Sequence, residues 1–317
     1  MTNNRYLPEG KLIGTKENRE LISSIAGLEK AMEQDIILES TVLLCDSDMN
    51  LHVNLGNAIG IIEKQEALLC RPDEEIKDIA LITRVGKPVC FKVLKIERRA
   101  DSVTVKLSRR AAQMECVQNY LSNLSCGDII PARVTHTENF GAFIDIGCGI
   151  ISLLSVDCIS VSRISHPQDR LLCGTDIFAV VKTIDKENGR IYVTHRELLG
   201  TWEENAALFS VGQTVAGIIR SIESYGIFIE LTPNLAGLAE LRDNKQHMNL
   251  SVGQSAAVYI KNIIPERMKI KLVLIDSQDS EIFVQPPKYF IDTSTVHHMD
   301  FWRYSPIICS KTVQTVF

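Results

Sequence analysis

The feature that most constrains the fold of this 317-residue chain is an internal repeat with an offset of 85 residues. Residues 139–147 read NFGAFIDIG, and residues 224–231 read SYGIFIEL. Both copies contain an aromatic residue, then a glycine and then, two positions later, a phenylalanine. Self-similarity at a fixed period indicates repeated structural units. The chain is therefore predicted to fold as tandem modules.

Each copy has the pattern of five short strands. Alternating apolar stretches have the period of half-buried strands, and glycines separate them. A closed five-stranded barrel of about 70 residues fits this pattern. A weaker third copy, residues 49–56, aligns with residues 140–147 at an offset of 91 but lacks both aromatic residues. The predicted fold is mainly β, with three tandem five-stranded OB-type barrels, helical spacers and an extended C-terminal tail.

Helical patterns separate the modules. Apolar residues recur at helical spacing in 17–34, 109–124 and 196–209, and none of these segments has the composition of a flexible linker. The predicted organisation follows the chain in seven parts: an N-terminal segment with a helix (1–36), a degenerate barrel (37–108), a spacer (109–125), a barrel (126–195), a second spacer (196–210), a third barrel (211–275) and a tail (276–317).

Composition excludes several classes of protein. No apolar run approaches the ~18 residues of a membrane helix, and the polar N-terminus has no secretion signal, so we expect a cytoplasmic protein without membrane contact. The nine cysteines form no CxxC pair, so neither a disulfide framework nor a metal site is expected. The net charge of −5 argues against a protein that coats nucleic acid by bulk charge.

The two stronger copies resemble a known family. Residues 126–197 and 211–275 are similar to the S-one RNA-binding domain, whose core motif is an aromatic-Gly-small-Phe strand followed by Gly-aliphatic-aliphatic-His. The order of the parts also resembles a bacterial, Firmicute-like ribosomal protein of the S-one family. The resemblance implies binding of single-stranded messenger RNA at the small ribosomal subunit, with no enzymatic activity, catalytic residue, cofactor or small-molecule substrate.

Aromatic and basic side chains of these copies are the candidate RNA-binding residues. Bases of single-stranded RNA stack on flat aromatic rings, and basic side chains bind phosphates. Strict alternation would place Phe140 and Phe143 on opposite faces of one strand, so a bend or bulge near Gly141 is expected. The candidates are Phe140, Phe143, Arg133, His136 and Arg190 in the second barrel, and Tyr225, Phe228, Arg220, Lys269 and Lys271 in the third.

The chain departs from the family motif at the histidine. Matching Gly149-Ile150-Ile151 to the motif places Ser152 there in the second copy, with Glu240 in the third copy and Glu63 in the first. A carboxylate repels phosphate, so weaker binding is expected from those two copies.

Two other functions fit the same modules. An adaptor that docks proteins would suit the acidic balance, the aromatic-poor first barrel and the aromatic tail. A regulator of RNA metabolism outside the ribosome could use the same barrels. No GxSxG, HExxH, P-loop or GxGxxG motif occurs, so an enzyme is not expected.

Overall fold

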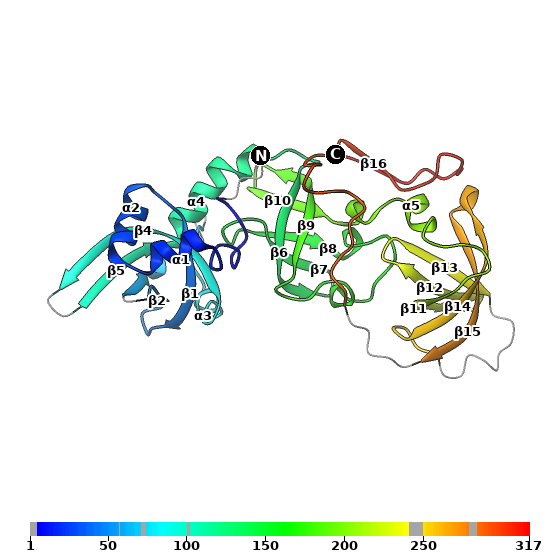
Figure 1. Ribbon diagram of the computed structural model, residues 1–317, viewed down its shortest axis with the longest axis horizontal. Coiled ribbons are helices and arrows are strands. Elements are labelled where there is room, and N and C mark those ends of the chain that lie inside the picture. Colours follow the sequence, from blue (N-terminus) through cyan, green and yellow to red (C-terminus); the bar gives the residue numbers. More distant parts are fainter. Residues whose placement is uncertain (1–4, 57, 71–73, 100–101, 241–249, 279–283) are drawn as a thin grey trace. The chain divides into compact units, whose positions relative to one another are not determined.

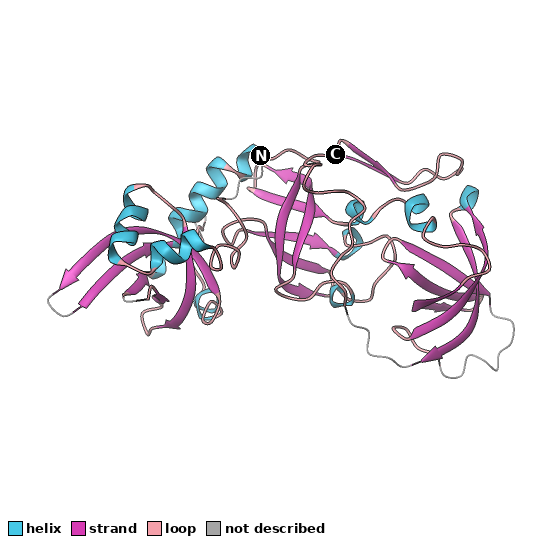
Figure 2. Cartoon of the chain, viewed as in Figure 1, coloured by secondary structure: helices cyan, strands magenta, loops and turns pink. Residues whose placement is uncertain are grey.

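The structure is a computed structural model that describes residues 5–56, 58–70, 74–99, 102–240, 250–278 and 284–317. It confirms the mainly β fold, with three closed five-stranded barrels (Figures 1 and 2). The chain divides into two compact units. The first contains residues 1–124 with the short segments 131–133 and 145–151, and the second contains residues 125–130, 134–144 and 152–317.

The first barrel has the strand order β1-β2-β3-β5-β4. Its strands are β1 (Leu38–Cys45), β2 (Leu51–Asn54), β3 (Ile59–Ile62), β4 (Pro88–Arg99) and β5 (Ser102–Ser108). Alternation along β2 buries Leu51 and Val53 while His52 and Asn54 stay accessible. These side chains pack with Phe91 of β4 and Leu107 of β5 in one core. The degenerate first copy therefore keeps the inward half of the repeat pattern.

The helices of the first unit differ from the predicted segments. The helix expected over 17–34 is two helices, α1 (Lys16–Ile22) and α2 (Ile25–Glu33). The break follows from Ser24, which has an extended backbone and whose side chain accepts the N–H of Gly27 as the N-cap of α2. A short helix, α3 (Asp78–Ile82), lies between β3 and β4, as does the 3₁₀ turn η1 (Lys64–Glu66). The spacer helix α4 (Arg109–Asn119) is followed by the 3₁₀ turn η2 (Leu121–Asn123).

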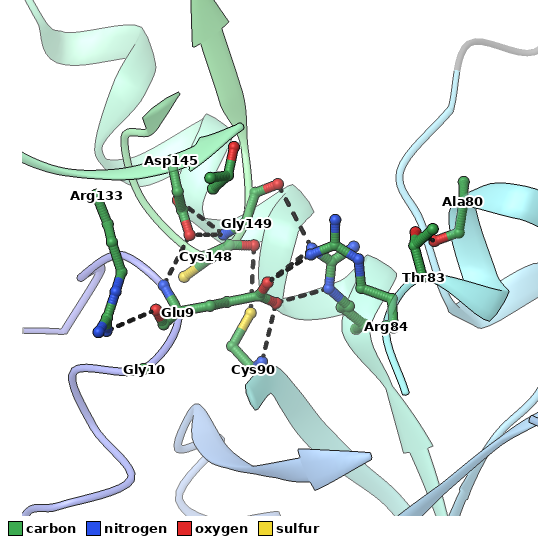
Figure 3. Close-up of polar contacts among 12 residues, drawn as sticks. Glu9, Gly10, Ala80, Thr83, Arg84, Cys90, Arg133, Asp145, Cys148 and Gly149 are labelled. Carbon is green, nitrogen blue, oxygen red and sulfur yellow. Dashed lines mark hydrogen bonds and ion pairs between the residues drawn. The ribbon is translucent and has the colours of Figure 1, made fainter. Parts of the chain in front are cut away.

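A buried ionic cluster centres on Glu9 of the N-terminal segment (Figure 3). Its carboxylate receives two charge-assisted hydrogen bonds from Arg109, at 2.6 and 3.0 Å, and one from the N–H of Cys90 at 3.1 Å. Arg84 lies 3.4 Å away. The N–H of Glu9 donates to the Asp145 carboxylate at 2.7 Å. Burial alone would raise the pKa of Glu9, but the Arg109 guanidinium holds it below its ordinary value.

The second barrel has the order β10-β8-β7-β6-β9. Its strands are β6 (Ile129–Glu138), β7 (Gly141–Asp145), β8 (Ile151–Ser155), β9 (Asp176–Asp185) and β10 (Arg190–Thr194). Two 3₁₀ turns, η3 (Val156–Cys158) and η4 (Pro167–Asp169), lie between β8 and β9.

The third barrel has the order β11-β12-β13-β15-β14. Its strands are β11 (Thr214–Glu223), β12 (Gly226–Thr232), β13 (Leu235–Glu240), β14 (Ser255–Ile264) and β15 (Lys269–Gln278), with the 3₁₀ turn η6 (Pro265–Arg267) between the last two. The helix expected over 196–209 is divided into η5 (Arg196–Leu199) and α5 (Trp202–Ala206), because Gly200 adopts a positive φ of 83° that ends the first turn.

The C-terminal segment packs on both barrels of the second unit. Its strands β16 (Phe301–Arg303) and β17 (Gln314–Val316) form a two-stranded sheet. Trp302 and Tyr304 are buried in the core of the third barrel, and the Tyr304 hydroxyl donates to the carbonyl of Asn234 at 2.6 Å. Nearer the start of the segment, the Tyr289 hydroxyl accepts the N–H of Phe178 on β9 at 2.9 Å. Across the described part of the chain, no helix has the length and apolar character needed to span a membrane.

Candidate nucleic-acid interface

Phe140 and Tyr225 occupy equivalent two-residue turns between the first two strands of their barrels. Phe140 lies between β6 and β7, and Tyr225 lies between β11 and β12, where Glu223 pairs with Gly226. Their side chains are 55% and 62% exposed, although both are large and apolar. The expected bend near Gly141 is therefore not what brings Phe140 beside Phe143, because Phe140 precedes the strand and strand alternation does not apply to it.

Each exposed ring meets a half-buried phenylalanine edge to face. The Phe140 and Phe143 rings lie 5.9 Å apart at 89°, and the Tyr225 and Phe228 rings lie 6.2 Å apart at 90°. This perpendicular arrangement is favourable for aromatic quadrupoles and holds the exposed ring in place. The outer ring therefore presents a face to solvent without having to become ordered when a base binds.

The glycine after each turn is required by close packing between strands. A Cβ on Gly141 would lie 2.5 Å from the carbonyl oxygen of Leu154, and one on Gly226 would lie 2.8 Å from that of Ala239. No side chain fits at these distances without moving the neighbouring backbone. The aromatic-Gly-x-Phe motif thus combines a turn that displays a ring with a close strand contact.

Strand pairing extends the aromatic pair into a row across the outer face of the third barrel. Phe228 pairs with Leu238, Leu238 pairs with Lys271, and Lys271 pairs with Asn262. On the other side of the row, Ser221 pairs with Phe228. The row crosses β11, β12, β13, β15 and β14, so it runs across the strands rather than along them. OB folds bind oligonucleotides on this part of the barrel.

The corresponding row of the second barrel contains a third aromatic residue. His136 stacks on Phe143, with ring centroids 6.3 Å apart and planes 16° apart. Leu153 pairs with Tyr192, and Tyr192 pairs with Thr183. Tyr192 therefore occupies the position of Lys271 and is half-buried on the same face. Tyr192 is not among the residues predicted from the sequence, although aligning residues 190–193 with 269–272 places it opposite Lys271.

The predicted basic residues separate into two groups, and the first group lies on or beside the outer faces of the barrels. Arg190 and Lys269 are exposed at the start of the fifth strand of their barrels. In the same group, Lys271 lies 3.4 Å from the Glu240 carboxylate, and His136 lies 2.7 Å from that of Glu138. Arg190 and Lys269 also flank the loops between the fourth and fifth strands, the second region that OB folds use for oligonucleotides.

Arg133 and Arg220 instead contact protein groups. Arg133 donates to the backbone carbonyl of Glu9 at 3.3 Å. The Arg220 side chain is 6% exposed and forms ion pairs with Glu230 at 2.8 Å and Asp169 at 3.2 Å. Glu230 also pairs with Arg170. The charge of Arg220 is thus balanced inside the protein, and this geometry does not favour an RNA contact by it.

The register of the sheets corrects the position of the family's histidine in the second barrel. Leu153 pairs with the fifth strand as Leu238 does in the third barrel and Ile61 does in the first. Two residues further along stand Ser155, Glu240 and Glu63 respectively. The equivalent residue is therefore Ser155 and not Ser152, which is buried and donates to the carbonyl of Ile191 at 2.6 Å.

The carboxylates at this position pair with a lysine of the neighbouring strand. Glu240 lies 3.4 Å from Lys271, and Glu63 lies 2.9 Å from Lys106. Each pair uses a charge that would otherwise be available to a phosphate. The second barrel has no carboxylate at this position, but the Ser155 hydroxyl donates to the carboxylate of Asp157, two residues further along.

The first barrel has lost the aromatic pair. Met49 and His52 stand at the positions of Phe140 and Phe143. His52 lies 3.0 Å from the Asp46 carboxylate, and this hydrogen bond lowers the pKa of Asp46 to about 2. At these two described positions, the first barrel therefore has no counterpart of the perpendicular ring pairs of the other two barrels.

Comparisons with known proteins find a match to a described family over the second barrel. A family model described as S1 RNA binding domain matches residues 124–196. Among relatives, small ribosomal subunit protein bS1 of Rhizobium meliloti is 29% identical over 70% of this chain and 40% of its own length. The Mycobacterium tuberculosis protein of that name is 25% identical over 89% of this chain and 59% of its own length.

A third relative comes from Bacillus subtilis. Its small ribosomal subunit protein bS1 homolog is 28% identical over 62% of this chain and 53% of its own length. The chain therefore spans about half the length of the curated relatives it matches.

Proposed function

We propose that this chain, an S-one-domain protein related to the bacterial small ribosomal subunit protein bS1, binds single-stranded RNA on the outer faces of its second and third barrels. The observation that carries the proposal is the pair of exposed rings, Phe140 and Tyr225, on equivalent turns. Each ring is held perpendicular to a half-buried phenylalanine. A base that stacks on such a ring contributes about 1–3 kcal/mol of binding free energy.

The second barrel is the principal RNA site in this proposal. Its row contains Phe143, the stacked His136 and Tyr192, and its strand end has Ser155 where the other barrels have a glutamate. The third barrel keeps the aromatic pair Tyr225 and Phe228, but the charge of Lys271 is partly neutralised by Glu240. Because every base has a π-face, stacking of this kind tolerates many sequences.

The relatives' names indicate the setting. Small-subunit ribosomal proteins act in translation, so the proposed RNA is messenger RNA and the proposed larger partner is the small ribosomal subunit, in the cytoplasm. The proposed role is binding rather than catalysis. The candidate RNA-binding residues are Phe140, Phe143, His136, Tyr192 and Arg190 in the second barrel, and Tyr225, Phe228, Lys269 and Lys271 in the third.

A protein-docking adaptor is the second candidate, and the first barrel is the observation that favours it. Its face has lost both aromatic residues yet exposes Leu43, Leu44 and Ile59, which are 51%, 46% and 52% accessible. The two functions can coexist on different barrels. They differ in their response to salt, because phosphate contacts weaken as salt rises and apolar protein contacts do not.

The decisive experiment is a fluorescence-anisotropy titration of a labelled, unstructured RNA of about 12 nucleotides, a length within the range that OB folds cover. The titration is done at about 50 and about 200 mM salt, a range over which phosphate contacts weaken. We expect saturable binding that weakens at the higher salt. Absence of binding at the lower salt would contradict RNA binding and favour docking, which pull-down with purified small ribosomal subunits would then test.

A further inference from the structure

The fourth strand of every barrel carries a β-bulge at the same place. Pairing with the fifth strand skips Leu94 in the first barrel, Lys182 in the second and Lys261 in the third. A bulge adds one residue to a strand and re-aims its side chain. In all three barrels the skipped residue and the one after it are both exposed, whereas regular alternation would turn one of the two inward.

The bulges lie at the far end of the row that begins at the turn aromatics. In the second barrel, Thr183 follows the bulge residue and pairs with Tyr192. In the third, Asn262 follows it and pairs with Lys271. Along the row, through the third and fifth strands, three strand spacings separate the second strand of each barrel from the fourth, a span of about 14 Å. An RNA segment of about four nucleotides, the smallest site size of an OB fold, covers this span.

The chain itself provides a comparison. The two barrels that keep the aromatic turn have a lysine at the bulge, and the barrel that has lost it has Leu94, which is 49% exposed. The bulge is therefore a property of the fold, and the lysine accompanies the aromatic residues. A cation at the bulge is not needed for packing, because an exposed leucine occupies the same place in the first barrel.

We propose that Lys182 and Lys261 bind RNA phosphates where the RNA leaves the barrel face on which its bases stack. This inference rests on the proposed RNA binding. It adds the direction of the bound RNA, which runs from the turn aromatics across the sheet to the fourth strand. The Lys182 ammonium lies 3.1 Å from the Cys158 sulfur, beside the turn that follows β8. That turn follows Ser155, which stands where the other barrels have a glutamate, and contains Asp157, whose carboxylate accepts the Ser155 hydroxyl and interacts electrostatically with Lys182.

The test measures the salt dependence of RNA binding for Lys182→Met, Lys261→Met and the double variant. For single-stranded nucleic acid, each phosphate contact contributes about 0.7 to the slope of log K against log salt concentration. We expect each single variant to reduce the slope by about 0.7 and the double variant by about twice that. Lys261→Arg keeps the charge and is expected to retain the wild-type slope.

Lys311→Met serves as the matched control, since it removes an exposed lysine from the C-terminal segment. Its slope should equal that of the wild type. Unchanged slopes for Lys182→Met and Lys261→Met, in variants whose circular dichroism and thermal midpoint match the wild type, would overturn the inference while RNA binding stands. No RNA binding by the wild type would overturn the proposed function itself.

Discussion

Replacing Phe140 by alanine is the sharpest perturbation of the proposed RNA site. The side chain is 55% exposed, and its ring packs against Phe143 in a perpendicular pair. Loss of that pair costs about 0.5–1.5 kcal/mol of folding stability, so the barrel should remain folded. Loss of a stacked base costs about 1–3 kcal/mol of binding. Because about 1.4 kcal/mol corresponds to a tenfold change in Kd, the expected weakening is about 5- to 150-fold.

The assay is the same anisotropy titration at low salt, with two companion variants. Tyr225→Ala tests the third barrel, and the combination with Phe140→Ala should weaken binding more than either change alone. Phe301→Ala is the matched control, because Phe301 is 48% exposed on β16 and lies outside both rows. A folded Phe140→Ala variant with unchanged Kd would refute stacking on this turn, and an equal loss from Phe301→Ala would show that the effect is not specific.

Three further predictions concern the second barrel and the buried polar groups. Tyr192→Ala should weaken RNA binding by about 1–3 kcal/mol, whereas Tyr192→Phe, which keeps the ring, should bind normally in the same titration. Glu9→Gln should cost about 3–5 kcal/mol of stability in urea unfolding because it leaves a buried arginine unpaired, whereas Glu17→Gln on the exposed face of α1 should cost almost nothing. Burial lowers the pKa of His195 to about 4, below an unfolded value of about 6.5. The stabilising contribution of the neutral His195 ring is therefore complete above pH ~6.5. It should fall by at most about 1.4 kcal/mol per pH unit as the pH drops from ~6.5 toward 4. The thermal midpoint should therefore fall with pH over this range in the exposed His297→Gln control, and it should fall less steeply in His195→Gln.

The repeat was sufficient to predict the barrels and to identify Phe140 and Tyr225, although it placed these two residues on strands and not in the turns that hold them. Alternation determines which side of a strand is apolar, and this information is local, so even the degenerate first copy could be recognised. Phe140 and Tyr225 could be identified because their motif recurs within the chain. The division of the helices was less predictable, since it depends on single capping and positive-φ residues, Ser24 and Gly200, within otherwise helical patterns.

The basic residues show where local information ends. Arg220 and Lys271 look alike in the sequence, as exposed cations of one module. Arg220 is neutralised by Glu230 of its own barrel and by Asp169, which is 51 residues away along the chain and belongs to the loop between β8 and β9. No pattern within one module indicates such a partner. Lys182 and Lys261 could not be identified as candidate RNA-binding residues for a related reason. A β-bulge is defined by the pairing of two strands, which the sequence does not show.

One position of the repeat shows what the sequence determines and what depends on the tertiary structure. Asp145 and Glu230 are the same acidic residue of the motif in the second and third copies, and both are buried on the second strand of their barrels. The sequence determined the strand, which of its residues face inward and the presence of a carboxylate on it. Only the tertiary structure decided the role of each. Asp145 accepts backbone N–H groups from Glu9, Gly147 and Gly149, while Glu230 pairs with Arg170 and Arg220. The reason is physical: a buried charge must find partners, and those that distinguish the two carboxylates, Glu9 and Arg170, lie close only after the chain has folded.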